Sequence, residues 1–237
     1  MKLNVRHKVW LVLSVGVAIF AVLQVRYAFM LKSSTLEEKK QKLRHVTETA
    51  YGVLKYYHEL ASQGKLSEED AKKMAMSAVK LMRYEGTEYF WINDTRLPYP
   101  QMVMHPTVSS LDGKTLDDPK YNCAKSMKAG TKGKEIKTDG KKNLFQAFVE
   151  VCKESGEGYV SYMWPKPLAG GGVTKEDYPK ISYVKLFEPW QWVIGSGIYI
   201  DDVDSAFRST LTQILLQNAF VIFVFIFAGL FLSKNLT

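Results

Sequence analysis

Residues 189–202 read PWQWVIGSGIYIDD, and this stretch decides how the chain is organised. Its aromatic and β-branched residues predict a strand from Trp190 to Ile200. From Asp201 onward the pattern becomes helical and continues without a linker into residues 214–232, ILLQNAFVIFVFIFAGLFL. A segment that is apolar on all sides and of this length predicts a membrane span. A strand that feeds a membrane helix directly is a mechanical connection between an outer domain and the membrane.

A second apolar segment lies near the N-terminus. Residues 9–25, VWLVLSVGVAIFAVLQV, carry no charge, and Arg26 can extend its side chain to the interface. No small-x-small cleavage site follows, so an uncleaved anchor is favoured over a signal peptide. Basic residues before the first span and after the second predict that both termini are cytoplasmic, in a two-pass protein of the cytoplasmic (inner) membrane. The predicted N-terminus, first membrane helix, outer domain, second membrane helix and cytoplasmic stub are residues 1–8, 9–31, 32–212, 213–232 and 233–237.

The excess positive charge is concentrated toward the chain ends. The formal net charge is +8, but residues 33–212 hold 26 basic and 24 acidic residues. A nucleic-acid surface would spread Lys and Arg over the folded domain, so no nucleic-acid partner is expected. The two Cys form no CxxC pair, which excludes a disulfide-dense scaffold and the usual zinc and c-type haem motifs, and no cofactor is expected. A bridge between Cys123 and Cys152 stays open, because both would face an oxidising compartment.

The outer domain begins with helical patterns. Residues 35–61 carry an apolar stripe at heptad-like spacing, made of Leu43, Val46, Ala50, Val53, Tyr57 and Leu60. This stripe either packs on the domain's own sheet or forms the seam of a dimer. Ser67, with Asp70 three residues later, predicts the start of a second helix that runs to about Met82.

Five short strands follow, and a third helix separates the second strand from the third. We expect the strands at 89–92, 101–105, 159–164, 181–187 and 190–200, and the helix at 142–154. Gly170 to Gly172 lack the Lys-Ser/Thr of a phosphate loop and predict a flexible connection. The fold class is therefore α+β, with a long N-terminal helix and an antiparallel five-stranded sheet.

Five motifs occur in an order that resembles a known sensor family. They are YFWIND (89–94), MVMHP (102–106), GYVSYMWPK (158–166), SYVK (182–185) and PWQWVIGSGIYIDD (189–202). Together they resemble the single Cache sensor domain, of the second single-Cache type, found in bacterial methyl-accepting chemotaxis proteins and some sensor kinases. The resemblance covers about residues 33–205. Residues 233–237, SKNLT, look like the start of a HAMP linker, so we expect a cytoplasmic signalling module that this chain lacks.

The resemblance implies a PAS-like sheet and an extracytoplasmic site for a small carboxylate such as acetate, propionate, pyruvate, lactate or malate. It also implies a homodimer, with the helix of residues 36–60 as the candidate surface. The chain departs from the simplest members in the longer turn of residues 95–100, TRLPYP, which leaves the ligand open.

Strand alternation supplies an independent argument for a bound anion. Lys185 shares one strand face with Ile181, Tyr183 and Phe187. If that face is inward, the ammonium needs a partner, since unpaired burial of a charge costs several kcal/mol. The alternative is a Lys at the sheet margin with its head in water.

Other side chains complete a candidate ligand site. His105 is a possible donor, Arg96 offers a fork that matches a carboxylate, and Tyr99 adds a neutral donor. Each also has a structural interpretation: His105 as a hydrogen-bonded core residue, and Arg96 and Tyr99 as parts of an exposed turn. Aromatic residues on neighbouring strands would wall the pocket or form ordinary core. The predicted ligand-binding set is Trp91, Arg96, Tyr99, His105, Tyr162, Trp164, Tyr183 and Lys185, and no metal site is expected, because no second His or acid stands at ligand spacing.

The sequence therefore predicts a membrane-anchored sensor that binds a small carboxylate, as in a chemotaxis receptor. The alternative is the sensor of a histidine kinase or nucleotide cyclase with the same outer domain. An enzyme is not expected, because neither a nucleophile–base pair nor paired catalytic carboxylates are found.

Overall fold

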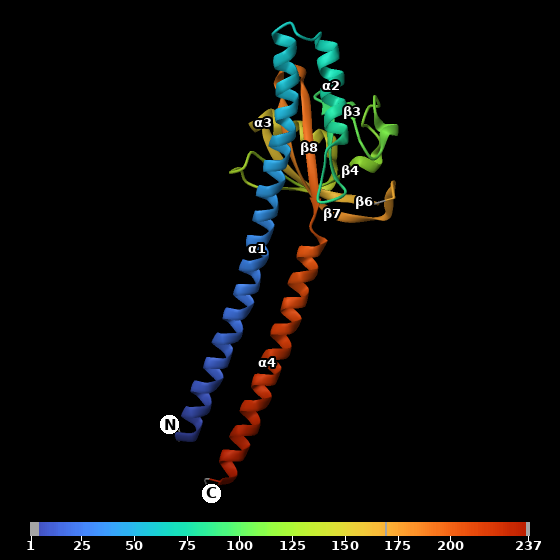
Figure 1. Ribbon diagram of the computed structural model, residues 1–237. Helices are drawn as coiled ribbons and strands as arrows, with labels where there is room; N and C mark the ends of the chain where they lie inside the picture. The colour runs from blue at the N-terminus through green and yellow to red at the C-terminus, as the bar shows by residue number, and fades with distance from the viewer. Residues whose placement is uncertain (1–4, 169, 236–237) are drawn as a thin grey trace. The chain divides into compact units, whose positions relative to one another are not determined.

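The computed structural model describes residues 5–168 and 170–235, and its ribbon is drawn in Figure 1. The chain folds as two compact units. One combines the residues up to Glu37 with those from Asp202 onward, and the other comprises Glu38–Asp201, which we call the sensor unit. Parts of the predicted cytoplasmic ends, residues 1–4 and 236–237, lie outside the described residues.

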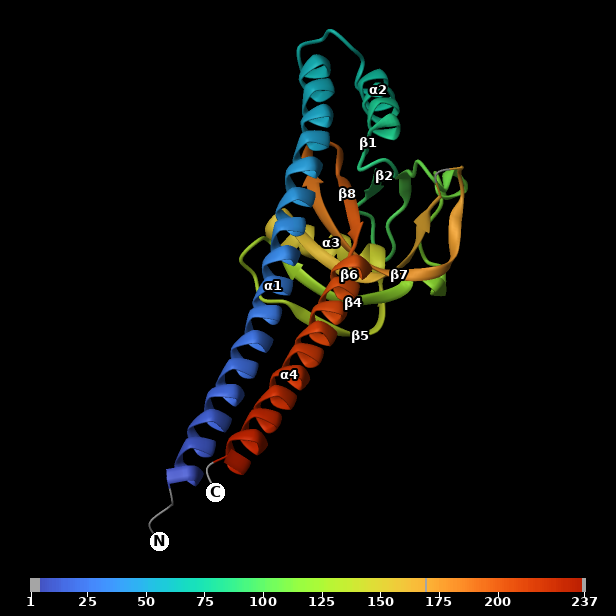
Figure 2. The same ribbon diagram turned by 60° about the horizontal axis from the view of Figure 1, so that its bottom comes forward.

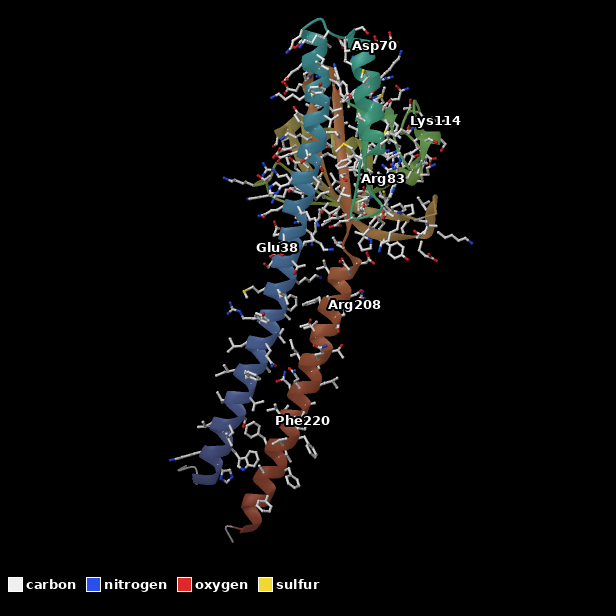
Figure 3. The ribbon with its side chains drawn as sticks, in the orientation of Figure 1. Glu38, Asp70, Arg83, Lys114, Arg208 and Phe220 are labelled. Atoms are coloured by element: carbon white, nitrogen blue, oxygen red, sulfur yellow. The ribbon has the colours of Figure 1, made fainter. Side chains whose placement is uncertain are left out.

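The first unit consists of two helices that run side by side in Figures 1 and 2. They are parts of α1 (Val5–Ser62) and α4 (Asp201–Asn235), and both are long and apolar enough to cross a membrane. Many apolar side chains on them are exposed, such as Phe220 in Figure 3, which is 67% exposed. The helices also share polar contacts: Asn218 Nδ2 donates to Gln24 Oε1 at 2.9 Å, and Lys32 pairs with Asp204 at 2.7 Å.

The sensor unit is built on one antiparallel sheet in the order β1-β2-β8-β7-β6-β4-β5, with β3 pairing to β2. The strands are β1 (Arg83–Tyr84), β2 (Glu88–Asp94), β3 (Met102–Met104), β4 (Asn122–Ala129), β5 (Ile136–Asn143), β6 (Glu157–Pro167), β7 (Val173–Phe187) and β8 (Trp192–Tyr199). The α+β class and the five predicted strands are confirmed, although Glu188–Trp190 forms a 3-10 turn before β8.

The expectation of only five strands is wrong, because β1, β4 and β5 were not predicted. The segment from 122 to 143 is rich in Lys and Gly, and only isolated residues such as Ala124 and Met127 are apolar and buried. One partly exposed strand and one edge strand do not need continuous apolar alternation, so the period-2 signal is weak there. Residues 107–120 are mainly loop as predicted, with short 3-10 turns at Ser109–Leu111 and Pro119–Tyr121.

Local signals position the two shorter helices. Ser67 accepts from the Asp70 backbone N–H and begins α2 (Glu68–Leu81), which confirms the predicted cap. Asn143 caps α3 (Leu144–Ser155) by accepting from two backbone N–H groups. Gly156 ends α3 in the left-handed region at φ 73°, a conformation that favours Gly.

Each face of the sheet has its own core. One face packs against α1 and α2, through residues such as Ala50, Leu54, Phe90 and Ile194. Four members of the predicted stripe of α1 belong to this core, Ala50 as a buried residue and Val46, Val53 and Tyr57 as partly buried ones, so much of the stripe packs on the domain's own sheet. Trp190 and Trp192 lie in the same core. The opposite face packs against α3, and it carries the candidate site.

Candidate functional site

Two glycines of β8 leave room for side chains from neighbouring strands. A Cβ at Gly195 would lie 2.4 Å from Cζ2 of Trp91, and a Cβ at Gly197 would lie 2.6 Å from Cε of Lys180. No side chain fits at such distances in a close-packed interior. Trp91 from β2 and Lys180 from β7 therefore extend over the surface of β8, on the face that α3 covers.

A small cavity lies between this face and α3. Its lining is mostly aromatic and consists of Tyr89, Trp91, His105, Leu144, Phe145, Phe148, Tyr162 and Trp164. The cavity volume is about 10 Å³, which is about enough for one water molecule. Even acetate has four heavy atoms, so a ligand can enter only if the lining side chains move apart.

Lys180 is the buried cation beside this cavity. Its side chain is 1% exposed, and its Nζ donates two long hydrogen bonds, to Tyr89 Oη at 3.4 Å and Tyr199 Oη at 3.3 Å. The ammonium also lies 4.6 Å from the centroid of each of these rings. Within residues 5–168 and 170–235, Lys180 forms no ion pair with a carboxylate. Burial raises the pKa of the Glu88 carboxyl and the charge of Lys180 opposes this rise, but the two side chains form no ion pair. A buried cation without a directly paired anion is costly, so a bound anion would stabilise this site.

His105 supplies a neutral donor at the same place. Burial, together with the charge of Lys180, lowers the pKa of His105 from 6.5 to about 3, so its imidazole is neutral near pH 7. The backbone N–H of Val108 donates to His105 Nδ1 at 3.1 Å, which assigns the ring proton to Nε2. Nε2 makes no hydrogen bond to another described residue, so it can donate to a ligand oxygen.

The structure brings four of the eight predicted ligand-binding residues together at the cavity: Trp91, His105, Tyr162 and Trp164. Arg96 is exposed in the turn after β2, where it bonds Asp94 and Gln101 at 2.6 Å each. Tyr99 is half-buried in the same turn, and neither residue lines the cavity.

Tyr183 and Lys185 lie on the opposite face of the sheet. Tyr183 is 0% exposed and donates to Glu157 Oε2 at 2.6 Å, while Lys185 Nζ lies 2.9 Å from the same oxygen and 3.5 Å from Glu48 Oε1. Burial opposes ionisation of Glu157, but these hydrogen bonds outweigh it and lower the pKa of its carboxyl. The expectation that Lys185 awaits an anion is therefore corrected: its partner is the protein's own carboxylate.

The sequence reasoning missed Lys180, Tyr89 and Tyr199. Lys180 precedes the predicted strand by one residue, and it shares its face with Ser182 because alternation extends backward along β7. Starting that strand at Pro179 would have placed a second Lys on the other face. The alternation pattern therefore included Lys180, but the predicted strand began one residue too late to show it.

The possible disulfide between Cys123 and Cys152 is not present. Both cysteines are free, and Cys152 lies on the buried side of α3.

Comparisons with known proteins agree with this architecture. A family model described as a Cache domain matches residues 23–235. The methyl-accepting chemotaxis protein McpP of Pseudomonas putida is 35% identical over 209 residues, which cover 88% of this chain and 34% of that protein. The sensor histidine kinase MctS of Rhizobium johnstonii is 24% identical over 196 residues, 81% of this chain and 36% of that protein. The chain thus spans about a third of the length of these curated relatives.

Solved structures show the same fold. One is described as the structural basis for carboxylic acid recognition by a Cache chemosensory domain. It is 35% identical, has a TM-score of 0.56, and covers 71% of this chain and 97% of its own. A periplasmic sensor domain of a chemotaxis protein is 38% identical with a TM-score of 0.55, over 70% of this chain and 97% of its own.

Proposed function

Because this chain belongs to the Cache domain family, we propose that it is the extracytoplasmic sensor region of a chemotaxis-type receptor that binds a small carboxylate beside Lys180. Two membrane helices would hold it in the cytoplasmic membrane. The observation that carries the ligand class is the fully buried Lys180 ammonium, which has no carboxylate partner among the described residues. The related structure described for carboxylic acid recognition supports the same class.

The geometry suits a small anion with one carboxylate. Its oxygens would accept from Lys180 and from Nε2 of His105, and its carbon chain would lie among Trp91, Phe148 and Tyr162. Short ligands are favoured, because each added carbon requires further displacement of packed aromatic rings. We propose binding without turnover.

Calorimetric titration of the full chain with acetate, propionate, pyruvate, lactate and malate tests the proposal. We expect saturable binding of at least one short monocarboxylate, with an affinity that stays flat between about pH 6 and 8, because His105 titrates far below this range. Absence of both binding heat and thermal stabilisation with all five acids would contradict the ligand class.

A second candidate is the sensor region of a histidine kinase, which the similarity to MctS favours. The outer domain and its ligand would be unchanged, and only the cytoplasmic output would differ. Reading the coding sequence beyond Thr237 distinguishes a chemotaxis signalling module from a kinase or cyclase module.

We further propose that Tyr199 carries the signal from the site to α4. Tyr199 is the last residue of β8, and Asp201 is the first of α4. Lys166 Nζ lies 5.3 Å from the Tyr199 ring centroid and 2.8 Å from Asp201 Oδ2. The Tyr199 ring therefore contacts both Lys180 of the proposed site and Lys166, which pairs with the first residue of α4. Tyr199 Oη also donates to the Pro165 carbonyl at 2.6 Å.

An anion that attracts Lys180 would weaken the hold of that ammonium on Tyr199. The ring and the strand end could then shift against Lys166 and the first turn of α4. Such a shift follows only if the ligand has different affinities for the two arrangements.

Lys166→Met is expected to reduce the ligand-induced change at α4 while the ligand affinity stays within about threefold, because Lys166 lies outside the cavity. Hydrogen exchange of residues 201–212 in the full chain, with and without ligand, measures the change. Lys175→Met, an exposed Lys on the same strand pair, is the matched control. An unchanged ligand response in Lys166→Met would contradict the route through Asp201.

A further inference from the structure

A basic ribbon lies at one edge of the sensor unit. Residues 120–142 hold eight Lys and only two acidic residues, Glu135 and Asp139. The remainder of residues 33–212 holds 18 basic and 22 acidic residues. We call the hairpin formed by β4, β5 and their connection the β4–β5 ribbon. Within the outer domain, residues 120–142 therefore carry a net positive charge, and the remaining residues carry a net negative charge.

Five exposed lysines of the ribbon form no ion pair among the residues that the structure describes: Lys125, Lys132, Lys134, Lys137 and Lys141. Outside residues 120–142, three of the seven exposed lysines of the sensor unit form an ion pair, namely Lys42, Lys55 and Lys73. Lys on an edge strand such as β5 also discourages edge-to-edge pairing. That role does not explain Lys125 on β4, which is paired on both sides, or the lysines of the turn.

The ribbon adjoins the strand that ties the sensor unit to its two chain connections. On β6, Tyr159 Oη donates to the backbone carbonyl of Lys40 at 3.3 Å, close to the start of the unit at Glu38. Farther along β6, Lys166 pairs with Asp201, the last residue of the unit. β4 pairs with β6 directly, and β5 follows β4. Figure 2 shows β4, β5 and β6 gathered at the end of the sheet opposite the α1–α2 turn.

The proposed membrane anchors tether the sensor unit to a bilayer through α1 and α4. The predicted apolar span begins at Ile214, 13 residues after Asp201 on the same helix. At 1.5 Å per residue these residues extend about 20 Å. Electrostatic attraction to an anionic membrane falls off over about 8 Å at physiological salt, so exposed lysine side chains on the ribbon are attracted when the tethered unit brings them within that range of the surface.

We propose that the β4–β5 ribbon is an interaction surface for anionic phospholipid headgroups of the outer leaflet. This inference rests on the membrane anchoring stated under the proposed function, but it does not involve the ligand cavity. Tethering at both chain connections raises the effective concentration of headgroups, so weak individual contacts suffice. The unpaired lysines supply the charge complementarity.

Hydrogen exchange of the full chain in lipid nanodiscs tests the surface. One set of discs contains phosphatidylcholine alone, and the other contains phosphatidylcholine with phosphatidylglycerol. We expect severalfold slower exchange of residues 120–142 in the anionic discs, and loss of this difference at high salt. The triple variant Lys134→Gln, Lys137→Gln, Lys141→Gln should lose the difference as well.

The matched control is Lys55→Gln, Lys65→Gln, Lys73→Gln, which removes the same charge near the α1–α2 turn that Asp70 marks in Figure 3. The control should keep the protection. Equal exchange in both disc types, equal loss in the two triple variants, or the same protection by soluble glycerophosphate would overturn the proposal. The same samples are also titrated with carboxylates. If carboxylates bind but the discs give no difference in exchange, the lipid proposal fails while the proposed ligand site stands.

Discussion

Lys180→Met is expected to weaken carboxylate binding by about 30-fold or more, and to leave the unliganded protein at least as stable as before. Removing one partner of a buried, hydrogen-bonded charge pair costs 2 kcal/mol or more in affinity, at about 1.4 kcal/mol per factor of ten. The unliganded state contains the cation without its anion, so a Met of similar length relieves an unfavourable burial. Substitution of a residue with only a structural role would not lower ligand affinity while leaving stability unchanged or higher.

Calorimetric titration and thermal unfolding of the two Lys→Met variants on β7 check this result. Lys185→Met is the matched control, because it removes the same charge from the same strand but on the opposite face. Its ligand affinity should stay within about threefold of the unmodified chain, since its carboxylate partner is Glu157. If Lys180→Met binds as tightly as before, or Lys185→Met abolishes binding, then the assignment of the site to the α3 face is wrong.

Gly195→Ala is expected to lower stability and ligand affinity together. Its Cβ would lie 2.4 Å from Cζ2 and 2.8 Å from Cη2 of Trp91, which is itself held between β8 and Phe148 at a ring separation of 5.2 Å. Overpacking of this kind costs about 1–3 kcal/mol, and each kcal/mol lowers the unfolding midpoint by about 2–4 °C for a domain of this size. Affinity falls as well, because Trp91 lines the cavity.

Thermal unfolding with Gly170→Ala as control measures the effect. Gly170 has nothing within 4 Å of an added Cβ and no positive φ, so this variant should be nearly neutral. The double variant Gly195→Ala with Trp91→Phe should recover part of the loss, since a smaller ring leaves space. A Gly195→Ala protein as stable as Gly170→Ala would mean that Trp91 does not lie over β8 in solution.

Much of the fold could be predicted from the sequence, because the patterns that specify it involve residues close together in the chain. The cap at Ser67, the aromatic strands and the direct passage from β8 into α4 all depend on neighbouring residues. The β4–β5 ribbon was not accessible, because an exposed edge needs little apolar alternation. Trp91 on β2 and Tyr162 and Trp164 on β6 line the cavity, because alternation along each strand places its large rings on one face.

The charged part of the site depends on information that one strand does not contain. Lys180 and Lys185 lie on opposite faces of β7, and alternation alone cannot say which face meets α3. The partner of Lys185 follows from register, since Glu157 stands directly opposite it on β6. Register is a tertiary property set by pairing along the whole sheet. The sequence therefore predicted an anion site next to aromatic rings, but it did not single out Lys180, the cation that we propose for it.

Under the proposed function, the glycines of β8 have a consequence for how ligand preference can change. Beside the cavity, Gly195 and Gly197 contribute only backbone, whereas the side chains proposed to contact the ligand come from β2, β6, β7, α3 and the segment after β3. Substitutions that alter which acid is recognised can therefore accumulate on those elements while β8 keeps its sequence. Ligand preference can therefore change between related proteins without substitutions in the strand that continues into α4.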